Sequence, residues 1–497
     1  MGRQPKKIVI VGGGIAATSC VDEVYKLQPS ANIVLISSSP VVKKAFQKVQ
    51  VTNRTFHFGV EEAQQQDIPL QVQLIIGTVK YVDFLAQRVT LESGTCYLYD
   101  KLCLCTGAIP KSIAPNNPRV LTLRDTTSLE RLCNALRSCN RIAIVGNGGI
   151  ALELVYALQG CEIYWIIRDT TIGTAFFDEE TSEFLWEVFE DSTRKDSYTG
   201  ATIDTVEPIE SFQEDDFIKE PLGFSPGPNW LYYEQNSDDK GKPLSRLRGL
   251  LSAKKVNVLN NCHVLSVHCN HVDSKDIFDS NIQPNSWPIS VQLSKYPHSL
   301  GCDWLISAVG VKPNTKFLQS TPLLLYPEEE NEGIVVNCRM ETNLENVYAA
   351  GDCCKVVDNE CSKWWFQMRL WSQAFFMGKV AAHSLLETGE DYSMYFELFT
   401  HVTEFFGTKI VLLGRYNAEA LGPDFEIITY QTPRDIDLSE RKLIRIVLYK
   451  GRMYGAVLVG DTDLEDTYEN LILSGLNVEE MKEALVSPEI GMEDYFD

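Results

Sequence analysis

A glycine turn between a strand and a helix occurs twice in this chain, and it constrains the fold more than any other feature. The first unit has the apolar run KIVIV at 7–11, three glycines, a helical stretch to about residue 27 and a second apolar run at 32–36. The segment 141–168 repeats this order, with its first glycine 134 positions after Gly12. Such βαβ units build doubly wound α/β folds that bind dinucleotides. The sequence therefore predicts an α/β protein with two Rossmann-like domains and two nucleotides.

Both turns follow the pattern G-x-G-x-x-A, in which the first glycine makes the turn and the second lets the backbone approach a pyrophosphate. The pattern is carried by Gly12, Gly14 and Ala17 in the first unit and by Gly146, Gly148 and Ala151 in the second. The following helix offers free N–H groups and a partial positive charge to the phosphates. Each turn is thus predicted to hold one dinucleotide.

A third motif ends in an acid. The segment TNLENVYAAGD at 342–352 predicts a strand and a tight glycine turn before Asp352. Two interpretations stay open, and both place Asp352 at the start of a following helix. In the first, the carboxylate binds a polyol hydroxyl of a ligand. In the second, it caps the helix N-terminus, which is the commoner role of such a residue.

The segment 141–310 is longer than two βαβ units require, and its excess near 186–260 is polar and rich in glycine and proline. We expect an insertion there, with a regulatory or partner-binding role as one hypothesis. After Gly389 the pattern changes to strands at 405–414, 442–450 and 452–461, with closing helices around 464–473 and 478–485. The predicted domains are a first dinucleotide domain at 1–135 and 311–390, a second at 136–310, and a small α+β domain at 391–497.

Charge and composition exclude several function classes. The formal net charge is -22, which disfavours nucleic acid and anionic lipid as partners. Twelve Asp or Glu residues fall in 461–497, a solvated segment or, less favoured, a partner-binding tail. No apolar run approaches the length of a membrane span. The 14 cysteines form no disulphide framework, which favours a reducing compartment, the cytosol or the nucleus.

Two further clusters suggest structure more than chemistry. The pairs Cys262-His263 and His268-Cys269 have a spacing unsuited to zinc on a predicted strand, so we expect no metal site. The segment 364–371 contains three tryptophans and is predicted to be a helix that covers a cofactor pocket or packs in the core.

The motifs, taken in order, resemble those of the class I pyridine nucleotide-disulphide oxidoreductases, flavoproteins that include glutathione reductase and apoptosis-inducing factor. The resemblance extends over nearly the whole chain. It is carried by residues 12–17, 105–108, 146–153, 307–314 and 348–352.

The resemblance implies an FAD-dependent oxidoreductase in which hydride passes from NAD(P)H to flavin N5. It assigns the first glycine turn to FAD, with Thr106, Gly107, Gly351 and Asp352 as further contacts and Asp352 on the ribityl chain. It assigns the second turn to NADPH, NADH or both. Glu153 matches a family glutamate near flavin N5 that is often paired with a lysine, and Lys43 is the candidate for that lysine. A cation there would stabilise negative charge on the flavin, although Lys43 could equally be an ordinary solvated lysine.

Two ribose-binding positions depart from the family pattern. The acid that usually binds the adenosine ribose of FAD is replaced by serine, most simply Ser38, which would bind without charge. On the nicotinamide side, Ile167 removes a carboxylate and Arg168 could pair with a 2'-phosphate. NADPH, or use of both nucleotides, is therefore favoured, although Asp169 weakens the inference.

A third departure concerns the mechanism. Disulphide reductases of this family carry a redox dithiol just before that lysine, but no cysteine occurs from 21 to 95. Cys103 and Cys105 share one face of a strand that should be buried, which favours packing. Cys353 and Cys354 follow the predicted flavin-binding acid, and here too we favour core packing over a strained vicinal disulphide. The flavin is thus expected to reduce an unidentified acceptor directly.

The resemblance also implies a cellular role. Family members are linked to the oxidative-stress response and to protection of the tRNA ligase complex. Two alternatives to an enzyme stay open. One is a redox-sensing flavoprotein that acts through protein partners. The other is a degenerate scaffold that has lost FAD, which the colour of the purified protein would reveal.

Overall fold

The computed structural model describes eleven segments of the chain: 6–40, 42–52, 54–64, 67–198, 247–251, 253–269, 287–318, 321–325, 333–357, 362–390 and 393–486. It divides into two compact units. As far as they are described, the first comprises residues 1–111 and 310–497, and the second comprises 112–226 and 231–309. Each unit is described by itself.

The first unit contains a parallel five-stranded sheet with the order β21-β9-β1-β2-β5. Its strands are β1 (Lys7–Val11), β2 (Asn32–Ser37), β5 (Val72–Ile76), β9 (Lys101–Leu104) and β21 (Val347–Ala349). The runs are short, buried and rich in β-branched residues, as expected for a parallel sheet covered on both faces. Helix α1 (Ile15–Leu27) connects β1 to β2. The first predicted βαβ unit is therefore confirmed.

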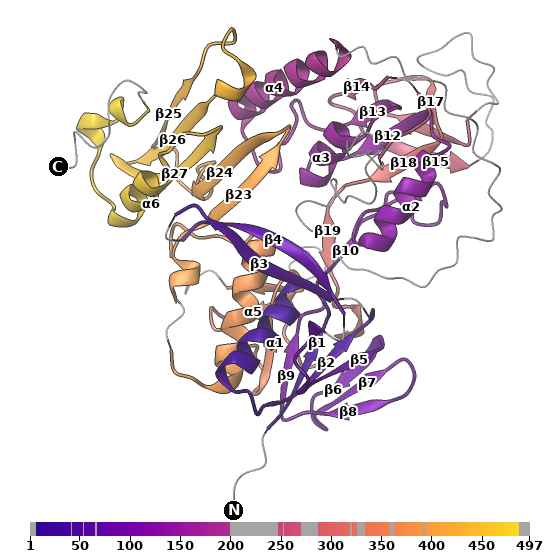
Figure 1. The fold of residues 1–497 in the computed structure, drawn as a ribbon, viewed down its shortest axis with the longest axis vertical. Coiled ribbons are helices and arrows are strands. Elements are labelled where there is room, and N and C mark those ends of the chain that lie inside the picture. Colours follow the sequence, from indigo (N-terminus) through magenta and orange to yellow (C-terminus); the bar gives the residue numbers. More distant parts are fainter. Residues whose placement is uncertain are drawn as a thin grey trace, which may run out of the picture. The chain divides into compact units, whose positions relative to one another are not determined.

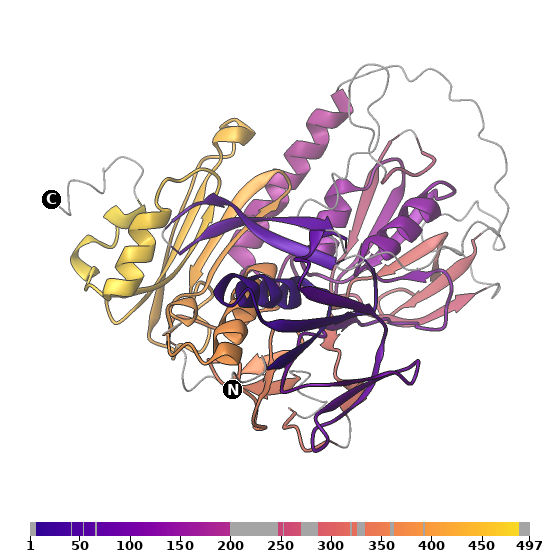
Figure 2. The same ribbon diagram turned by 60° about the horizontal axis from the view of Figure 1, so that its bottom comes forward.

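Helix α5 (Trp371–Leu386) lies side by side with α1 (Figures 1 and 2). The two helices approach closely at Gly378, where an added Cβ would lie 2.3 Å from the carbonyl oxygen of Ala16. Ser19 Oγ also donates a hydrogen bond of 2.7 Å to the carbonyl oxygen of Phe375. These contacts join two segments that are more than 350 residues apart in the sequence.

Shorter elements complete this part of the first unit. Strands β3 (Val42–Gln50) and β4 (Phe56–Ala63) form an antiparallel hairpin. A three-stranded antiparallel meander is formed by β6 (Val79–Asp83), β7 (Arg88–Leu91) and β8 (Cys96–Leu98). Two further sheets have two strands each: β10 (Ala108–Pro110) pairs with β19 (Val311–Pro313), and β20 (Ile334–Val336) pairs with β22 (Cys354–Val356). The 3-10 turns are η4 (Lys316–Leu318) and η6 (Ser393–Phe396).

The second unit contains another parallel five-stranded sheet, with the order β11-β18-β12-β13-β14. Its strands are β11 (Val120–Leu121), β12 (Arg141–Val145), β13 (Glu162–Ile166), β14 (Lys255–Leu259) and β18 (Trp304–Ser307), and its helices are α2 (Thr126–Leu136), α3 (Gly149–Ala157) and α4 (Glu179–Tyr198). An antiparallel sheet of β15 (Val264–Cys269), β16 (Ile289–Leu293) and β17 (Ser299–Cys302) packs with it. The second βαβ unit and the predicted α/β class are thus confirmed.

Helix α3 stops at Ala157, because Leu158 is already extended, and Gly160 then turns with φ +61°. Of the predicted insertion near 186–260, the first residues belong to α4 and residues 255–259 form β14, whereas 199–246 lie outside the described residues. The insertion stays a prediction.

The end of the chain folds into an antiparallel sheet with the order β23-β24-β27-β26-β25, drawn in orange and yellow in Figure 1. Its strands are β23 (Thr400–Phe405), β24 (Thr408–Gly414), β25 (Phe425–Gln431), β26 (Leu443–Tyr449) and β27 (Arg452–Val459). Helix α6 (Glu465–Ser474) packs on it through Tyr468, Leu471 and Ile472.

The prediction of a second closing helix at 478–485 is wrong. Two 3-10 turns stand there, η8 (Glu479–Met481) and η9 (Ala484–Val486). A segment this short has little room to propagate a helix beyond its costly first turn.

The predicted helix at 364–371 is also wrong, because α5 begins only at Trp371. Two glutamine side chains hold the preceding residues outside a helix. Gln367 Oε1 accepts from the N–H of Val356 at 2.8 Å, and Gln373 Oε1 accepts from the N–H of Met368 at 2.8 Å. Tertiary hydrogen bonds therefore override the local preference. None of the helices in the described part of the chain is long and apolar enough to cross a membrane.

Candidate cofactor-binding sites

The first glycine turn has two glycines with different environments. Gly12 adopts φ +132°, and an added Cβ would lie 2.1 Å from the carbonyl oxygen of Cys105. Gly14 is the N-cap of α1, and an added Cβ would meet nothing within 4 Å. Position 12 must therefore be glycine because any side chain would collide with the main chain of Cys105. Gly14 instead leaves free space at the N-terminus of the helix. With no side-chain cap and no acid in the first turn, these N–H groups suit an anionic pyrophosphate.

The acid motif lies against this turn. Gly351 has φ +80°, and an added Cβ would lie 2.9 Å from Cβ of Ala16 at the start of α1. Asp352 follows directly and is half-buried. Strand β22 comes next, paired in parallel with β20, so both interpretations that placed a helix directly after Asp352 are wrong in that respect. This excludes the N-cap role for Asp352 and leaves the hydroxyl-binding interpretation.

Thr106 and Gly107 stand where β9 leaves the sheet. Thr106 Oγ1 donates to the carbonyl oxygen of Asn314 at 2.8 Å, and the N–H of Asn314 donates to the carbonyl oxygen of Gly107 at 2.9 Å. These bonds fix the paired linkers β10 and β19. An added Cβ at Gly107 would meet nothing within 4 Å, so this residue borders open space. The role of both residues in FAD binding stays a prediction.

Three serines stand at the end of β2, with Ser37 as its last residue, and only one side chain faces solvent. Ser37 Oγ is buried, donates to the carbonyl oxygen of Ser39 at 2.6 Å and accepts from the N–H of Ser39 at 3.1 Å. Ser39 is buried as well, whereas Ser38 is exposed. Ser38 is thus the accessible hydroxyl at the position expected to contact the adenosine ribose.

Lys43 is the second residue of β3 and is bonded to the first glycine turn. Its N–H donates to the carbonyl oxygen of Gly13 at 3.0 Å, and its carbonyl oxygen accepts from Thr18 Oγ1 at 2.6 Å. The residue is only 4% exposed, so the alternative of an ordinary solvated lysine is wrong. Lys44 differs, because its Nζ lies 3.2 Å from Oδ1 of Asp22 on a more open side. The turn therefore anchors the main chain of Lys43, whose side chain is buried.

The second glycine turn repeats the geometry of the first. Gly146 has φ +136°, and an added Cβ would lie 2.1 Å from the carbonyl oxygen of Ala308. An added Cβ at Gly148, the N-cap of α3, would meet nothing within 4 Å. Ala151 is fully buried beneath the turn, and Glu153 lies half-buried further along α3. Lys43 belongs to the first unit and Glu153 to the second.

The residues after β13 bear on nucleotide choice. Ile167 is fully buried, and the Arg168 side chain is 77% exposed. Asp169 folds back on the glycine turn, where Asn147 and Thr174 donate to Oδ2 at 3.0 and 2.8 Å. Partial burial opposes ionisation, yet these hydrogen bonds hold the pKa of Asp169 below its usual range. The other oxygen, Oδ1, lies 3.6 Å from Nε of Arg168, so the turn occupies only one side of the carboxylate and the objection that Asp169 raises to an NADPH preference stands.

Replacing Arg168 with glutamate is expected to weaken NADPH binding by about 1–3 kcal/mol more than NADH binding, because only NADPH carries a 2'-phosphate for a charge-assisted hydrogen bond to this arginine. Dissociation constants from equilibrium titration of both nucleotides measure the difference. Arg131→Glu, on the exposed surface of α2, is the matched control. An equal loss for both nucleotides would contradict the assignment.

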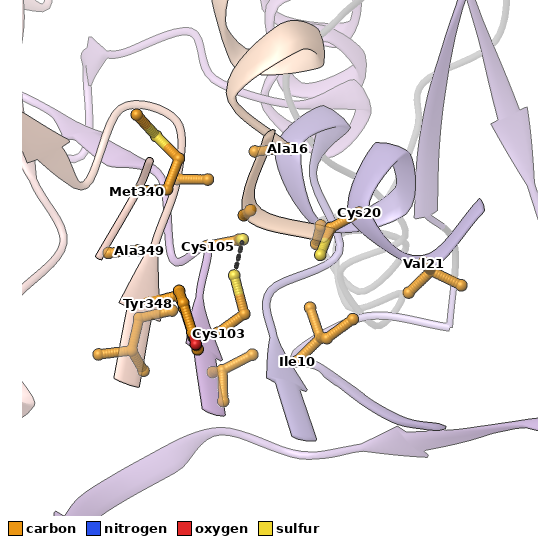
Figure 3. Close-up of a cluster of buried hydrophobic side chains, with 14 of the residues drawn as sticks. Ile10, Ala16, Cys20, Val21, Cys103, Cys105, Met340, Tyr348 and Ala349 are labelled. Carbon is orange, nitrogen blue, oxygen red and sulfur yellow. Dashed lines mark hydrogen bonds between the residues drawn. The ribbon is translucent and has the colours of Figure 1, made fainter. Parts of the chain in front are cut away.

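The cysteines near the first turn are buried. Figure 3 shows Cys103 and Cys105 beside Cys20 of α1, and the two sulfur atoms of Cys103 and Cys105 lie 3.5 Å apart. The hydrogen bond with Cys103 and burial raise the pKa of Cys105 well above its usual range. Because the thiolate is the reactive form, such thiols are poor redox centres. The prediction that Cys103 and Cys105 share a buried face is confirmed.

Cys353 and Cys354 are also fully buried and are not joined in a disulphide. Cys353 Sγ donates to the carbonyl oxygen of Leu104 at 3.2 Å, and Cys354 Sγ donates to that of Gly351 at 3.3 Å. Burial and the hydrogen bond with Cys353 raise the pKa of Cys354 well above its usual range, whereas the hydrogen bond from Cys354 lowers that of Cys353 despite burial. Their contacts are those of core residues. Within the described residues, no group of His, Cys, Asp or Glu is arranged to hold a metal ion.

Comparison with known families decides the class of protein. A family model described as pyridine nucleotide-disulphide oxidoreductase matches residues 6–215 and 245–378. The chain belongs to this family. A human relative, pyridine nucleotide-disulfide oxidoreductase domain-containing protein 1, is 37% identical over 505 residues, covering 99% of this chain and 98% of its own. As a member of the family, the protein is an FAD-dependent oxidoreductase that uses NAD(P)H, and its glycine turns fit both dinucleotides.

Solved structures share the fold of this family member. The crystal structure of Fdr9 superposes with a TM-score of 0.66 at 17% identity, covering 97% of this chain and 98% of that chain. The water-forming NADH oxidase from Lactobacillus brevis bound to NADH gives a TM-score of 0.65 at 16% identity, covering 99% and 95%.

Sequence reasoning missed one part of the site, the β3–β4 hairpin that carries Lys43. The alternation of apolar and polar residues in FHFGVEEA at 56–63 is a strand signal that could have found its second half. The first half, VKKAFQKVQ, carries three lysines and gives only a weak strand signal. This segment becomes a strand by pairing with β4, and the local sequence does not indicate that pairing.

Proposed function

We propose that this protein passes electrons from NAD(P)H through FAD directly to an acceptor, without a redox-active dithiol of its own. One observation carries the proposal. The chain from residue 21 to Lys43 contains no cysteine, and Lys43 itself is bonded to the first glycine turn through main-chain groups. A disulphide reductase needs two thiols at this place to receive the electrons.

The residues of the chain then have separate tasks. The N-termini of α1 and α3 bind the two pyrophosphates, and Gly14 and Gly148 give the space for their approach. Asp352 accepts hydrogen bonds from the ribityl hydroxyls, and Ser38 contacts the adenosine ribose. Bound FAD supplies the hydride acceptor and the electron chemistry. Lys43 contributes a buried positive charge, and Glu153 orients the nicotinamide side.

Exposed Arg168 and buried Ile167 support NADPH, or both nucleotides, as the electron donor. A 2'-phosphate would compete with Asp169 for Arg168, and an arginine at this position does not prevent NADH from binding. The Lactobacillus brevis oxidase, whose structure holds NADH, shows that this fold also accepts the nucleotide without that phosphate.

Titration with NADPH is expected to end near two electrons for each FAD, because no dithiol stores a second pair. Anaerobic titration followed by the flavin absorbance measures the endpoint. Replacing both Cys353 and Cys354 with serine is expected to leave the endpoint and the reduction rate nearly unchanged. Consumption of about four electrons, or loss of reoxidation by every acceptor in the double variant, would show that this pair is a redox centre.

The family resemblance also supports a proposal for the role of the protein in the cell. The protein serves the oxidative-stress response in the cytoplasm, the nucleus or both, and it protects a partner such as the tRNA ligase complex. Slow turnover with a long-lived nicotinamide–flavin complex would favour a redox sensor that acts through this partner. Rapid turnover with a small acceptor would favour an enzyme alone, so stopped-flow reduction followed by acceptor screening separates the two.

A further inference from the structure

The side chain of Asn147 ties the second glycine turn to the loop that follows β13, residues 168–174. Asn147 is the residue after the first glycine of that turn. Its Oδ1 accepts a hydrogen bond of 2.6 Å from the N–H of Gly173, and its Nδ2 donates to the carbonyl oxygen of Thr171 at 2.8 Å. One side chain therefore binds the main chain of the loop at two points.

The same amide also reaches the carboxylate of Asp169. Nδ2 of Asn147 lies 3.0 Å from Oδ2 of Asp169 and 2.8 Å from Oγ1 of Thr174, and this hydroxyl donates to the same Oδ2 at 2.8 Å. The two N–H groups of the amide are thus shared among three oxygens. Oδ1 of Asp169 lies 3.6 Å from Nε of Arg168. The carboxylate is therefore held by the turn on one side and faces the arginine on the other.

Other hydrogen bonds hold the turn and the loop independently of the Asn147 side chain. The buried indole of Trp165 donates from Nε1 to the carbonyl oxygen of Gly146 at 2.7 Å, which fixes the turn. The N–H of Asn261 donates to the carbonyl oxygen of Asp169 at 3.0 Å, which fixes the start of the loop. Removal of the Asn147 amide should therefore leave both main-chain segments in place and chiefly release the Asp169 carboxylate.

We propose that Asn147 is a positioning residue for nucleotide selectivity, because it restrains Asp169 on the glycine turn and limits the pairing of that carboxylate with Arg168. The inference rests on the electron donor proposed above, NADPH or both nucleotides. The turn binds the pyrophosphate of either nucleotide, whereas only NADPH has a 2'-phosphate for Arg168. Without the amide, fewer donors hold Oδ2, and both carboxylate oxygens can turn to the exposed guanidinium, which pairs well with a carboxylate in a bidentate manner. Such a pair would compete with the 2'-phosphate and would leave NADH binding unaffected.

The test titrates the flavin-loaded protein with NADP+ and NAD+, which differ in the same 2'-phosphate and do not reduce the flavin. Asn147→Ala is expected to lower the preference for NADP+ over NAD+ by about 3–10-fold, the effect of one hydrogen bond. The affinity for NAD+ is expected to stay within about 2-fold, because the turn keeps its bond from Trp165. Dissociation constants from calorimetry measure both effects.

Asn260→Ala is the matched control. Nδ2 of Asn260 donates to the carbonyl oxygen of Thr170 at 2.8 Å, so this variant also removes an asparagine that binds the loop, but one without a printed bond to the Asp169 side chain. Both affinities are expected to stay within about 2-fold of those of the parent protein. A change of preference as large as that in Asn147→Ala would show that any loosening of the loop has this effect, and it would overturn the proposal.

A double-mutant cycle tests whether Asn147 acts through Asp169. Asp169→Asn removes the charge that faces Arg168, so adding Asn147→Ala to this variant is expected to change the preference by less than about 2-fold. If the effect of Asn147→Ala persists in this background, or if Asn147→Ala weakens both nucleotides equally, Asn147 has only a structural role and the proposal is overturned.

Arg168→Glu in the same titration separates this inference from the proposed function. A selective loss of NADP+ in Arg168→Glu, with an unchanged preference in Asn147→Ala, would overturn the role of Asn147 and leave the contact between Arg168 and the 2'-phosphate standing. No selective loss in either variant would overturn that contact as well.

Discussion

The Gly14→Ala variant is expected to fold but to purify without its yellow colour, with FAD affinity lowered by roughly 100-fold or more. The backbone at residue 14 has φ -84°, which alanine adopts without strain, and the added Cβ meets no protein atom within 4 Å. The same Cβ would occupy the space that lets the main chain approach a pyrophosphate. FAD content after purification and fluorescence titration of the apoprotein measure the loss.

Gly148→Ala is the matched variant in the second unit, and it should keep FAD and lose affinity for NADPH. It is expected to stay yellow but to be reduced by NADPH only at much higher nucleotide concentration, because only the second turn is obstructed. Retention of FAD at full affinity by Gly14→Ala would show that this turn does not hold the flavin nucleotide. Loss of FAD in Gly148→Ala would contradict the assignment of the second turn.

The first glycine of each turn provides the structural control. An alanine at Gly12 would need φ +132° and would place its Cβ 2.1 Å from a main-chain oxygen, as it would at Gly146. Strain of this kind lowers the free energy of unfolding by roughly 2–5 kcal/mol. These variants are expected to lose stability as well as binding, so colour alone does not identify a binding residue.

The parts of the fold that the sequence predicted well are those that local patterns determine. A buried β-branched run, a glycine turn and a helix define each βαβ unit within about 30 residues, so both units agree with the structure. The start of α5 was wrong because Gln367 and Gln373 bind main-chain groups before the helix. The structure after Asp352 was wrong because β22 exists only through its pairing with β20.

In the candidate site, too, local motifs were predictable and tertiary contacts were not. Motif spacing identified Gly12, Gly14 and Asp352, and the structure brings the Gly351 turn onto the start of α1. The burial of Lys43 was not predictable, because a lysine in VKKAF has the same local sequence whether it faces solvent or a cofactor. Burial depends on the hairpin with β4 and on α1, and both are tertiary contacts.

Lys43→Met is expected to keep FAD but to slow flavin reduction by NADPH about 10²–10³-fold, the effect of removing one preorganised charge beside developing negative charge. Methionine follows nearly the same path as lysine, and the contacts that anchor residue 43 use main-chain atoms, so the fold should persist. The two-electron reduction potential is expected to fall by about 30–60 mV, since 30 mV corresponds to about 1.4 kcal/mol. Stopped-flow absorbance and spectroelectrochemical titration measure the two effects.

Lys44→Met is the matched control, because Lys44 lies next in the chain but pairs with Asp22 on a more open side. Its rate and potential should stay within about 2-fold and a few millivolts of the parent protein, since the charge of Lys44 is already paired with Asp22. Lys43→Arg keeps the charge and should restore the potential more than the rate, because the guanidinium cannot occupy the same position as the ammonium. A Lys43→Met protein with normal rate and potential would reduce Lys43 to a packing residue. Loss of FAD in that protein would instead show that the lysine holds the flavin nucleotide in place.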